Sequence, residues 1–378
     1  MSLINRATAE LKGDRVIWAI VAVLALFSIL AVYSSSSLVA FQKRSGNTEF
    51  YLIKQVAILT LGLILTYAAY LLHYKRYNLW APYMLALVVP LLMLTLVIGR
   101  EINNASRWLD VPGIGLTFQT SDLAKIALIT YIARSITAKQ EHIRDFQSAF
   151  VPIIVPIIIV CLLIAPSDLS TAMVIFVTCL LMMFIGRVAI QYVLLLIFCG
   201  LVSFAGLIVA SKFLKEGAIR TDTWTSRMRD FIENGDGQPQ TQLAKMAIAK
   251  GGLFGNGPGN SIQKNYLPMA YTDYIYAVII EEYGLIGGFL TLSLYVLLFL
   301  RVVRLVTKSP KTFPAMLAMG LCLVLTIQAL ANMAVSVHLV PVTGLPMPMI
   351  SMGGTSLLFS CISLGMILSV SKFIETEK

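Results

Sequence analysis

The stretch from Val16 to Ser34, VIWAIVAVLALFSILAVYS, is apolar from end to end and carries no charge. A helix of about 20 such residues crosses the hydrocarbon core of a bilayer. Comparable runs recur along the rest of the chain, at about 53–72, 79–98, 118–137, 149–165, 170–187, 189–211, 274–300, 313–337 and 354–372. These runs predict an all-α integral membrane protein of about ten transmembrane helices. We expect a single transmembrane domain over 1–378, with a long polar loop at 212–272 between the seventh and eighth spans.

The composition supports a bilayer environment. The chain has 378 residues, of which 58% are hydrophobic and only 13% are charged. Soluble domains keep about a quarter of their residues charged. The lipid bilayer must therefore be the solvent for most of this surface, and we expect the first span to stay as a helix rather than be cleaved as a signal peptide.

The cysteines and histidines exclude several kinds of site. The five cysteines lie inside apolar stretches, the three histidines are scattered, and neither CxxC nor a Cys/His cluster occurs. The sequence therefore contains no residue pattern that indicates a disulfide framework, a zinc site or a Ser-His catalytic triad. The net charge of +10 comes without a dense basic run, so it indicates topology and lipid contact rather than nucleic acid.

Lysine and arginine set the orientation. With the N-terminus inside, the short outer loops hold only Lys43, Arg44, Arg100 and Arg107, and the cytoplasmic connections hold most of the others. Positive residues are enriched on the cytoplasmic side of membrane proteins. We therefore expect both termini in the cytoplasm and residues 212–272 outside.

Charges inside spans are costly and commonly have functional or paired roles. Such charges occur at Lys54, Lys125, Glu281 and Glu282. Asp122 lies three residues before Lys125, so the two can pair on one helix face. This pair could either lock helices together or line a polar site that opens outward.

Polar residues gather on the outer side in four segments: 103–109, 166–171, the long loop, and 341–356. The loop contains the glycine-rich run Gly251–Gly259, which lacks the Lys-Ser/Thr of a P-loop and so does not indicate a nucleotide site. Its glycines would let backbone amides turn tightly, near an anion. The Pro/Gly-rich segment after Pro341 should break a helix where it lines a cavity or is covered by protein.

Asp273 opens the eighth span, where the exposed N–H groups of a helix N-terminus favour an anion. From its position alone, Asp273 is either a helix cap or an ionised group at the membrane surface.

Six motifs along the chain together resemble one family. They are Asn-Ala-Ser-Arg-Trp-Leu (104–109), Gln-Thr-Ser-Asp-Leu-Ala-Lys (119–125), Asp-Leu-Ser-Thr (168–171), the stretch 242–259, Tyr-Thr-Asp-Tyr-Ile-Tyr-Ala-Val (271–278) with Glu-Glu-Tyr-Gly (281–284), and Pro-Val-Thr-Gly-Leu-Pro (341–346) with Gly-Gly-Thr-Ser (353–356). In this order the chain resembles the SEDS family, whose members FtsW and RodA polymerise peptidoglycan in division and elongation.

The resemblance implies a peptidoglycan glycosyltransferase of the bacterial cytoplasmic (inner) membrane. It would polymerise lipid II on the outer face, release undecaprenyl diphosphate, and act with a class B penicillin-binding protein and other division or elongation proteins. The family's essential aspartate falls on Asp273, which we expect to be the general base. We expect substrate contacts from Lys125, Asp122, Arg107, Trp108, Asp168, Gln242, Lys250 and Ser351. A divalent cation (Mg or Mn) could assist, although the sequence contains no dedicated metal cage.

Six positions depart from the family pattern. Thr120 and Asp122 stand where Pro and Glu are usual, Met269 replaces a Glu, and Met352 replaces a Tyr. In the third motif Ser167 and Ser170 depart from Pro-Asp-Leu-Gly-Thr, which puts the role of Asp168 in question. The alternative function is a lipid II flippase. The short N-terminus and Met352-Gly353-Gly354-Thr355 favour an FtsW-like over a RodA-like role.

Overall fold

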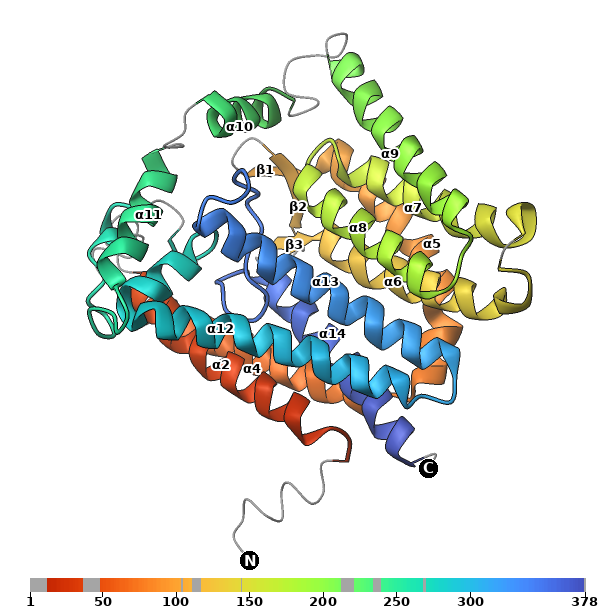
Figure 1. Cartoon of the computed structure of the whole chain (residues 1–378), viewed down its shortest axis with the longest axis horizontal. Coiled ribbons are helices and arrows are strands. Elements are labelled where there is room, and N and C mark those ends of the chain that lie inside the picture. Colours follow the sequence, from red (N-terminus) through yellow and green to blue (C-terminus); the bar gives the residue numbers. More distant parts are fainter. Residues whose placement is uncertain are drawn as a thin grey trace, which may run out of the picture. The chain divides into compact units, whose positions relative to one another are not determined.

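The computed structural model describes residues 12–36, 48–102, 105–110, 117–143, 145–211, 221–233, 239–267 and 270–376. By their internal contacts these residues form two compact units. The first comprises Met1–Leu71, Ser226–Val302 and Leu325–Lys378, and the second comprises Leu72–Thr225 and Val303–Val324. Figure 1 labels the helices and strands.

A helix lies at each of the ten predicted spans. These helices are α2 (Arg15–Ser35), α4 (Thr48–Leu71), α5 (Tyr74–Ile98), α6 (Thr120–Ala138), α7 (Val151–Ile164), α8 (Leu169–Ile185), α9 (Ile190–Ser211), α12 (Ile275–Thr307), α13 (Thr312–Ser336) and α14 (Thr355–Thr376). Among the described residues, six are long and apolar enough to cross a membrane, namely α2, α4, α5, α12, α13 and α14. The apolar helices α7, α8 and α9 contribute shorter apolar stretches, so a full count of ten spans stays a prediction.

The prediction of an all-α fold misses a small sheet. Strands β1 (Arg100–Ile102), β2 (Ala105–Asp110) and β3 (Thr117–Gln119) form an antiparallel sheet in the order β1-β2-β3, which pairs Trp108 with Arg100 and with Gln119. The ladder satisfies main-chain groups of the connection between α5 and α6 that a polar loop would leave to water.

The long loop contains helices as well. It holds α10 (Thr221–Glu233), α11 (Pro239–Gly251) and the short 3-10 helix η3 (Gln263–Asn265). The remaining short helices, η1 (Gln140–His142) and η2 (Phe146–Phe150), belong to the second unit.

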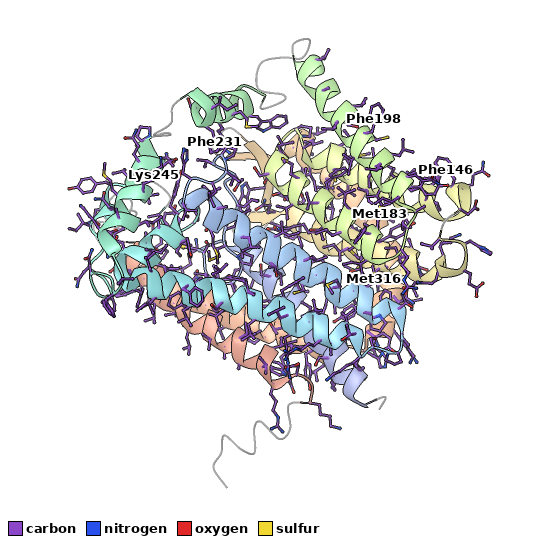
Figure 2. All side chains as sticks on the ribbon, viewed as in Figure 1. Phe146, Met183, Phe198, Phe231, Lys245 and Met316 are labelled. Carbon is purple, nitrogen blue, oxygen red and sulfur yellow. The ribbon has the colours of Figure 1, made fainter. Side chains whose placement is uncertain are left out.

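In the second unit, α6 is the central helix and packs against α5, α7 and α8. Most of its side chains are buried, whereas helices at the periphery keep apolar side chains exposed. Figure 2 labels an example of each environment, the buried Met183 of α8 and the exposed Phe198 of α9. Exposed apolar side chains on long helices are expected where lipid is the solvent.

In the first unit, α4 packs against α2 and α14. A Cβ added to Gly365 on α14 would lie 2.3 Å from the carbonyl oxygen of Thr66 on α4, so only glycine permits this approach. The hydroxyl of Thr66 donates to the carbonyl of Cys361 across the same contact, at 3.0 Å. Small residues of this kind let transmembrane helices pack closely.

Helix α12 is broken at Gly284, which has φ 71° and ψ −173°. The glycine-rich run packs into this break: the carbonyl of Gly252 accepts from the N–H of Leu285 at 2.9 Å, and the N–H of Gly257 donates to the carbonyl of Glu282 at 3.0 Å. The run therefore supplies the main-chain hydrogen bonds that the broken helix lacks.

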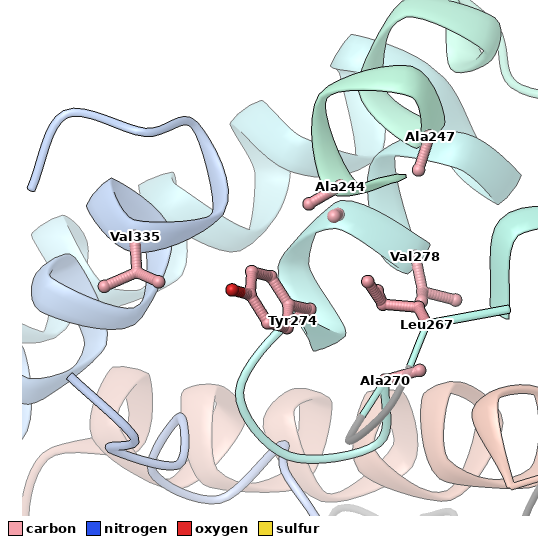
Figure 3. Packing of buried hydrophobic residues seen from close by; sticks show 8 residues of the cluster. Ala244, Ala247, Leu267, Ala270, Tyr274, Val278 and Val335 are labelled. Carbon is pink, nitrogen blue, oxygen red and sulfur yellow. The ribbon is translucent and has the colours of Figure 1, made fainter. Parts of the chain in front are cut away.

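A buried apolar cluster joins the long loop to the start of α12 (Figure 3). Tyr274, fully buried, lies at its centre, with Leu267 and Ala270 from the preceding segment. Ala244 and Ala247 of α11 and Val335 of α13 complete the packing around it. Because Asp273 directly precedes Tyr274, this cluster fixes the main chain beside that aspartate.

Candidate functional site

Asp273 lies half-buried in a turn just before α12. The side-chain amide of Asn332 on α13 donates to the main-chain carbonyl of Asp273 at 3.1 Å and to that of Leu345 at 2.8 Å. A Cβ added to Gly344, which has φ +71°, would lie 4.0 Å from Oδ2 of Asp273. The carboxylate therefore lies beside the segment 341–346, near Gly344.

Ser351 has a positioning role in this arrangement. Its hydroxyl donates to the carbonyl of Thr272 and accepts from the N–H of Met347, both at 2.8 Å. The N–H of Met352 donates to the carbonyl of Tyr271 at 3.0 Å, and Gln328 donates to the carbonyl of Pro346 at 2.8 Å. The non-helical backbone expected after Pro341 is therefore satisfied by protein groups that also hold the Asp273 turn.

The two tyrosines that flank Asp273 are shifted toward their neutral form. Burial raises the pKa of Tyr271, and the nearby Tyr51 and Asp273 raise it further. Burial also raises the pKa of Tyr274, and Asp273 adds to that rise. The hydrogen bond with Thr241 and the charge of Arg227 act in the opposite direction on Tyr274. Asp273 therefore lies among neutral hydroxyl groups, with a guanidinium within electrostatic range of Tyr274.

A small hollow, partly open to solvent, lies next to this turn. Its lining comes from α10, α11 and the segment after α13, and consists of Arg227, Asp230, Phe231, Thr241, His338, Pro341 and Val342. Arg227 donates to the carbonyl of Val342 at 3.0 Å, and the Thr241 hydroxyl lies 3.4 Å from that of Tyr274. Thr241 thus links the hollow to the Asp273 turn, and Arg227 links it to the segment 341–346.

In the second unit, Asp122 and Lys125 form the predicted pair. Nζ of Lys125 lies 2.6 Å from Oδ1 of Asp122, and both side chains are buried. Oδ2 of Asp122 is also buried and has no hydrogen-bond partner among the described residues. Beside the start of α6 is a second small hollow, whose lining includes the hydroxyl-bearing residues Thr95, Thr120 and Ser167. The pair therefore lies near a hydroxyl-lined space, with one carboxylate oxygen still able to accept.

The other residues predicted to contact the substrate lie at separate places in the structure. Asp168 is buried and caps α8, accepting from the N–H of Thr171 at 3.1 Å. Trp108 is half-buried on β2. Arg107 also lies on β2, but its side chain is outside the described part of the chain. Gln242 and Lys250 are exposed on α11.

Of Glu281 and Glu282, predicted to be functional or paired, Glu282 forms an ion pair and Glu281 is held by hydrogen bonds. Glu281 accepts from the N–H groups of Ile262 (3.0 Å) and Gln263 (3.3 Å) and from the hydroxyl of Ser261. Nζ of Lys264 lies 3.4 Å from Oε1 of Glu282. The amides of the glycine-rich run donate to the main-chain carbonyls of these two acids, and the anion expected near the run stays a prediction.

Lys54 differs from these acids because its side chain is exposed near the start of α4. Its position is one from which a long side chain can reach the headgroup region, and a functional role for it stays a prediction. No group of three or more His, Cys, Asp or Glu able to hold a metal ion occurs among the described residues.

The sequence did not single out Gly344, Lys264 or His338 as parts of a site. It contained a signal for Asn332 and Gln328, because amides inside an apolar helix require partners. Nothing local indicated that Gly344 approaches Asp273 or that Lys264 meets Glu282.

Comparisons with known proteins cover nearly the whole chain. Residues 14–376 match a family model, FtsW/RodA/SpoVE, described as cell cycle protein. A probable peptidoglycan glycosyltransferase FtsW of Geobacter sp. (strain M18) is 33% identical over 362 residues, covering 95% of this chain and 96% of that protein. Stage V sporulation protein E of Bacillus subtilis (strain 168) is 30% identical over 370 residues, covering 97% and 99%.

Among solved structures, the fold is similar to a chain of a peptidoglycan synthase complex described as coordinating polymerization and crosslinking. The TM-score is 0.73 at 26% identity, covering 96% of this chain and 98% of that one.

Proposed function

Because the chain belongs to the FtsW/RodA/SpoVE family, we propose that it is a peptidoglycan glycosyltransferase that polymerises lipid II, with Asp273 as its general base. The observation that carries the assignment of Asp273 is its setting: its carboxylate lies beside Gly344, and its main chain is held by Asn332. A base held in a fixed position can take a proton from a bound hydroxyl.

The proposed step is a displacement at the anomeric carbon of the donor sugar. The acceptor hydroxyl forms the new C–O bond and passes its proton to the Asp273 carboxylate. The bond to undecaprenyl diphosphate breaks, and its electron pair leaves with the diphosphate. A diphosphate whose charge is neutralised leaves readily, so a second carboxylic acid is not needed for its protonation, unlike in glycosidases.

Cations must neutralise the diphosphate. Lys125 stays our proposal for this role, supported by its burial beside Asp122 and by the hydroxyl-lined hollow nearby. Arg107 and Lys250 remain proposed contacts, as do Trp108, Asp168 and Gln242. We assign Ser351 to positioning, because its hydroxyl is bonded to the main chain on both sides.

We further propose that the chain resides in the cytoplasmic membrane with both termini inside, and that a class B penicillin-binding protein is its partner. The bias of Lys and Arg supports this orientation. The similarity to a chain of a peptidoglycan synthase complex supports the partner.

The direct test is Asp273→Asn in the purified full-length chain, assayed in detergent with its penicillin-binding partner and lipid II. A β-lactam present throughout removes cross-linking. Loss of a general base should slow polymerisation by about 100-fold or more. Asp145→Asn, an exposed acid at the start of η2, is the matched control and should retain full activity.

Long glycan strands from the Asp273→Asn protein would show that the base is assigned wrongly. If even the wild-type pair makes no polymer and product requires an added bifunctional penicillin-binding protein, the flippase becomes the better assignment. Detergent removes the two sides of a membrane, so transport alone can give no product there.

A further inference from the structure

Two large apolar side chains of the glycine-rich run, Leu253 and Phe254, lie on the surface of the protein. Their exposed fractions are 62% and 80%. The five residues 251–255 carry no polar side chain, although they belong to the loop that the sequence predicts to be polar. Exposed apolar side chains that lie next to one another mark surfaces that contact a partner or a membrane. The run is therefore a candidate contact surface of the long loop.

The apolar surface of α12 continues onto these two residues. The N–H of Ile286 donates to the carbonyl of Leu253 at 3.4 Å. Ile286 is itself exposed, as are Leu285 beside it and Phe289 one turn further along α12. Because α12 is long and apolar enough to cross a membrane, its exposed apolar side chains face acyl chains. Leu253 and Phe254 extend that lipid-facing surface at the level where α12 is broken.

The length of α12 places this contact within the depth of the hydrocarbon core. Arg301, near the other end of the helix, is paired with Asp14, and charges of this kind lie at the boundary of the core. Ile286 precedes Arg301 by about 15 residues, or about 22 Å at the 1.5 Å rise of a helix. The hydrocarbon core is about 30 Å thick. The contact between Leu253 and Ile286 therefore lies just inside the core, on the side of the long loop.

The main chain of the run is suited to that depth. Non-helical backbone occurs in the hydrocarbon region only where protein groups satisfy its hydrogen bonds. The carbonyls of Gly251, Gly252 and Leu253 each accept a main-chain hydrogen bond, at 2.8, 2.9 and 3.4 Å. Polar side chains resume at Asn256, whose N–H donates to the carbonyl of Glu281 at 3.0 Å, further toward the loop end of α12. The apolar part of the run is thus the deeper part.

The charges around the run fit the surface of an anionic membrane. Residues 239–267 contain three lysines and no acid. Lys264 is buried against Glu282, whereas Lys250 is exposed at the end of α11, three residues before Leu253. Tyr266 is exposed as well. Lysine near a membrane surface attracts anionic headgroups, and tyrosine is enriched at the membrane–water interface. The chemistry and the continuity with α12 both indicate lipid as the occupant.

We propose that the glycine-rich run is a membrane anchor of the long loop. It inserts Leu253 and Phe254 among the acyl chains of the leaflet on the side of the long loop, with Lys250 at the level of the lipid phosphates. Because the run is bonded to the break in α12, the anchor holds that break at a fixed height in the membrane. The anchor is independent of the proposed chemistry at Asp273.

The test places a tryptophan at one of two neighbouring exposed positions of the run. Phe254→Trp reports on the apolar part, and Asn256→Trp is the matched control two residues away. Each full-length variant is placed in nanodiscs of phosphatidylcholine and phosphatidylglycerol, with or without bromine on the acyl chains. The same samples are titrated with aqueous iodide. The parent chain, with its four native tryptophans, supplies the emission to be subtracted.

Bromine quenches an indole only at contact, so Phe254→Trp should lose most of its added emission in brominated nanodiscs and little of it to iodide. Asn256→Trp, nearer the headgroups, should lose less to bromine and more to iodide. Leu253→Trp is the second probe of the apolar part and should behave like Phe254→Trp. Both replaced side chains are exposed, so the melting temperatures should match that of the parent.

Two results would overturn the proposal. Strong quenching of Phe254→Trp and Leu253→Trp by iodide, with no loss to brominated lipid, would place the run in water. Protection of both probes from both quenchers would show that protein covers the surface, as in contact with a second copy of the chain. Neither measurement involves turnover, so the result stands whether or not Asp273 is the general base.

Discussion

Asn332, inside the apolar helix α13, donates a hydrogen bond of 3.1 Å to the main-chain carbonyl of Asp273. The same amide donates to the carbonyl of Leu345 at 2.8 Å, and the side chain is fully buried. One side chain therefore bonds both the turn that presents the carboxylate and the segment that lies beside it.

Asn332→Leu should lower turnover strongly, because the variant frees both segments to shift. Leaving each buried carbonyl without a donor costs about 1–3 kcal/mol, so the melting temperature should also fall. Gln55→Leu is the control, since its buried amide donates at 2.8 Å to Ser28, a residue of α2 with no proposed role in the site. A similar loss of stability without a loss of turnover is expected there. Equal turnover in the two variants would refute the positioning role of Asn332.

The buried pair of Lys264 and Glu282 predicts a non-additive stability effect. Lys264→Met leaves the Glu282 carboxylate buried without its cation, a change that costs about 3–5 kcal/mol in buried pairs. The double variant Lys264→Met with Glu282→Met removes both charges and should recover much of that loss. Thermal unfolding of the wild type, Lys264→Met, Glu282→Met and the double variant in one detergent measures the coupling between the two charges. Additive losses would mean that the two charges do not interact.

The glycine-rich run should tolerate alanine at Gly252 better than at Gly255. Gly252 and Gly255 both have positive φ, so alanine strains either position. A Cβ at Gly255 would lie 2.2 Å from the carbonyl oxygen of Glu282, whereas one at Gly252 meets no described atom within 4 Å. Gly255→Ala should therefore lower the yield of monodisperse protein far more than Gly252→Ala. Size-exclusion profiles of the two variants check this, and indistinguishable profiles would contradict the packing at the α12 break.

Lys125→Ala should abolish polymerisation, and Lys125→Arg should not fully restore it, because an ammonium and a guanidinium fork bind an anion with different geometry. A purely structural role for the Asp122 pair predicts another outcome: a lower melting temperature with normal turnover in the protein that remains folded. Measuring both quantities on one sample separates the two roles.

The orientation can be tested with two exposed positions. Ala249 lies on α11 in the long loop, and Lys308 follows α12. In spheroplasts, Ala249→Cys should react with a membrane-impermeant maleimide, and Lys308→Cys should react only after lysis. The wild-type chain, with its five native cysteines, provides the background. The reverse pattern would place Asp273 on the cytoplasmic side.

The sequence alone determined the helices and one part of the candidate site. An apolar run of bilayer length is a local property, so each predicted span coincides with a helix. The pairing of Asp122 with Lys125 follows from a three-residue spacing on one helix, which the structure confirms at 2.6 Å. The place of Asp273 just before α12 is likewise a local feature.

Tertiary structure decided which distant groups come together, around that aspartate and at other buried charges. Glu282 bonds Ser34, which is 248 residues away, and Asn332 reaches Asp273 across 59 residues. Gly344 lies near the Asp273 carboxylate, and His338 meets Phe231 just after the left-handed turn that ends α13. Such contacts depend on packing between segments far apart in the chain. Local spacing and periodicity carry no information about which distant polar groups packing brings within hydrogen-bond distance.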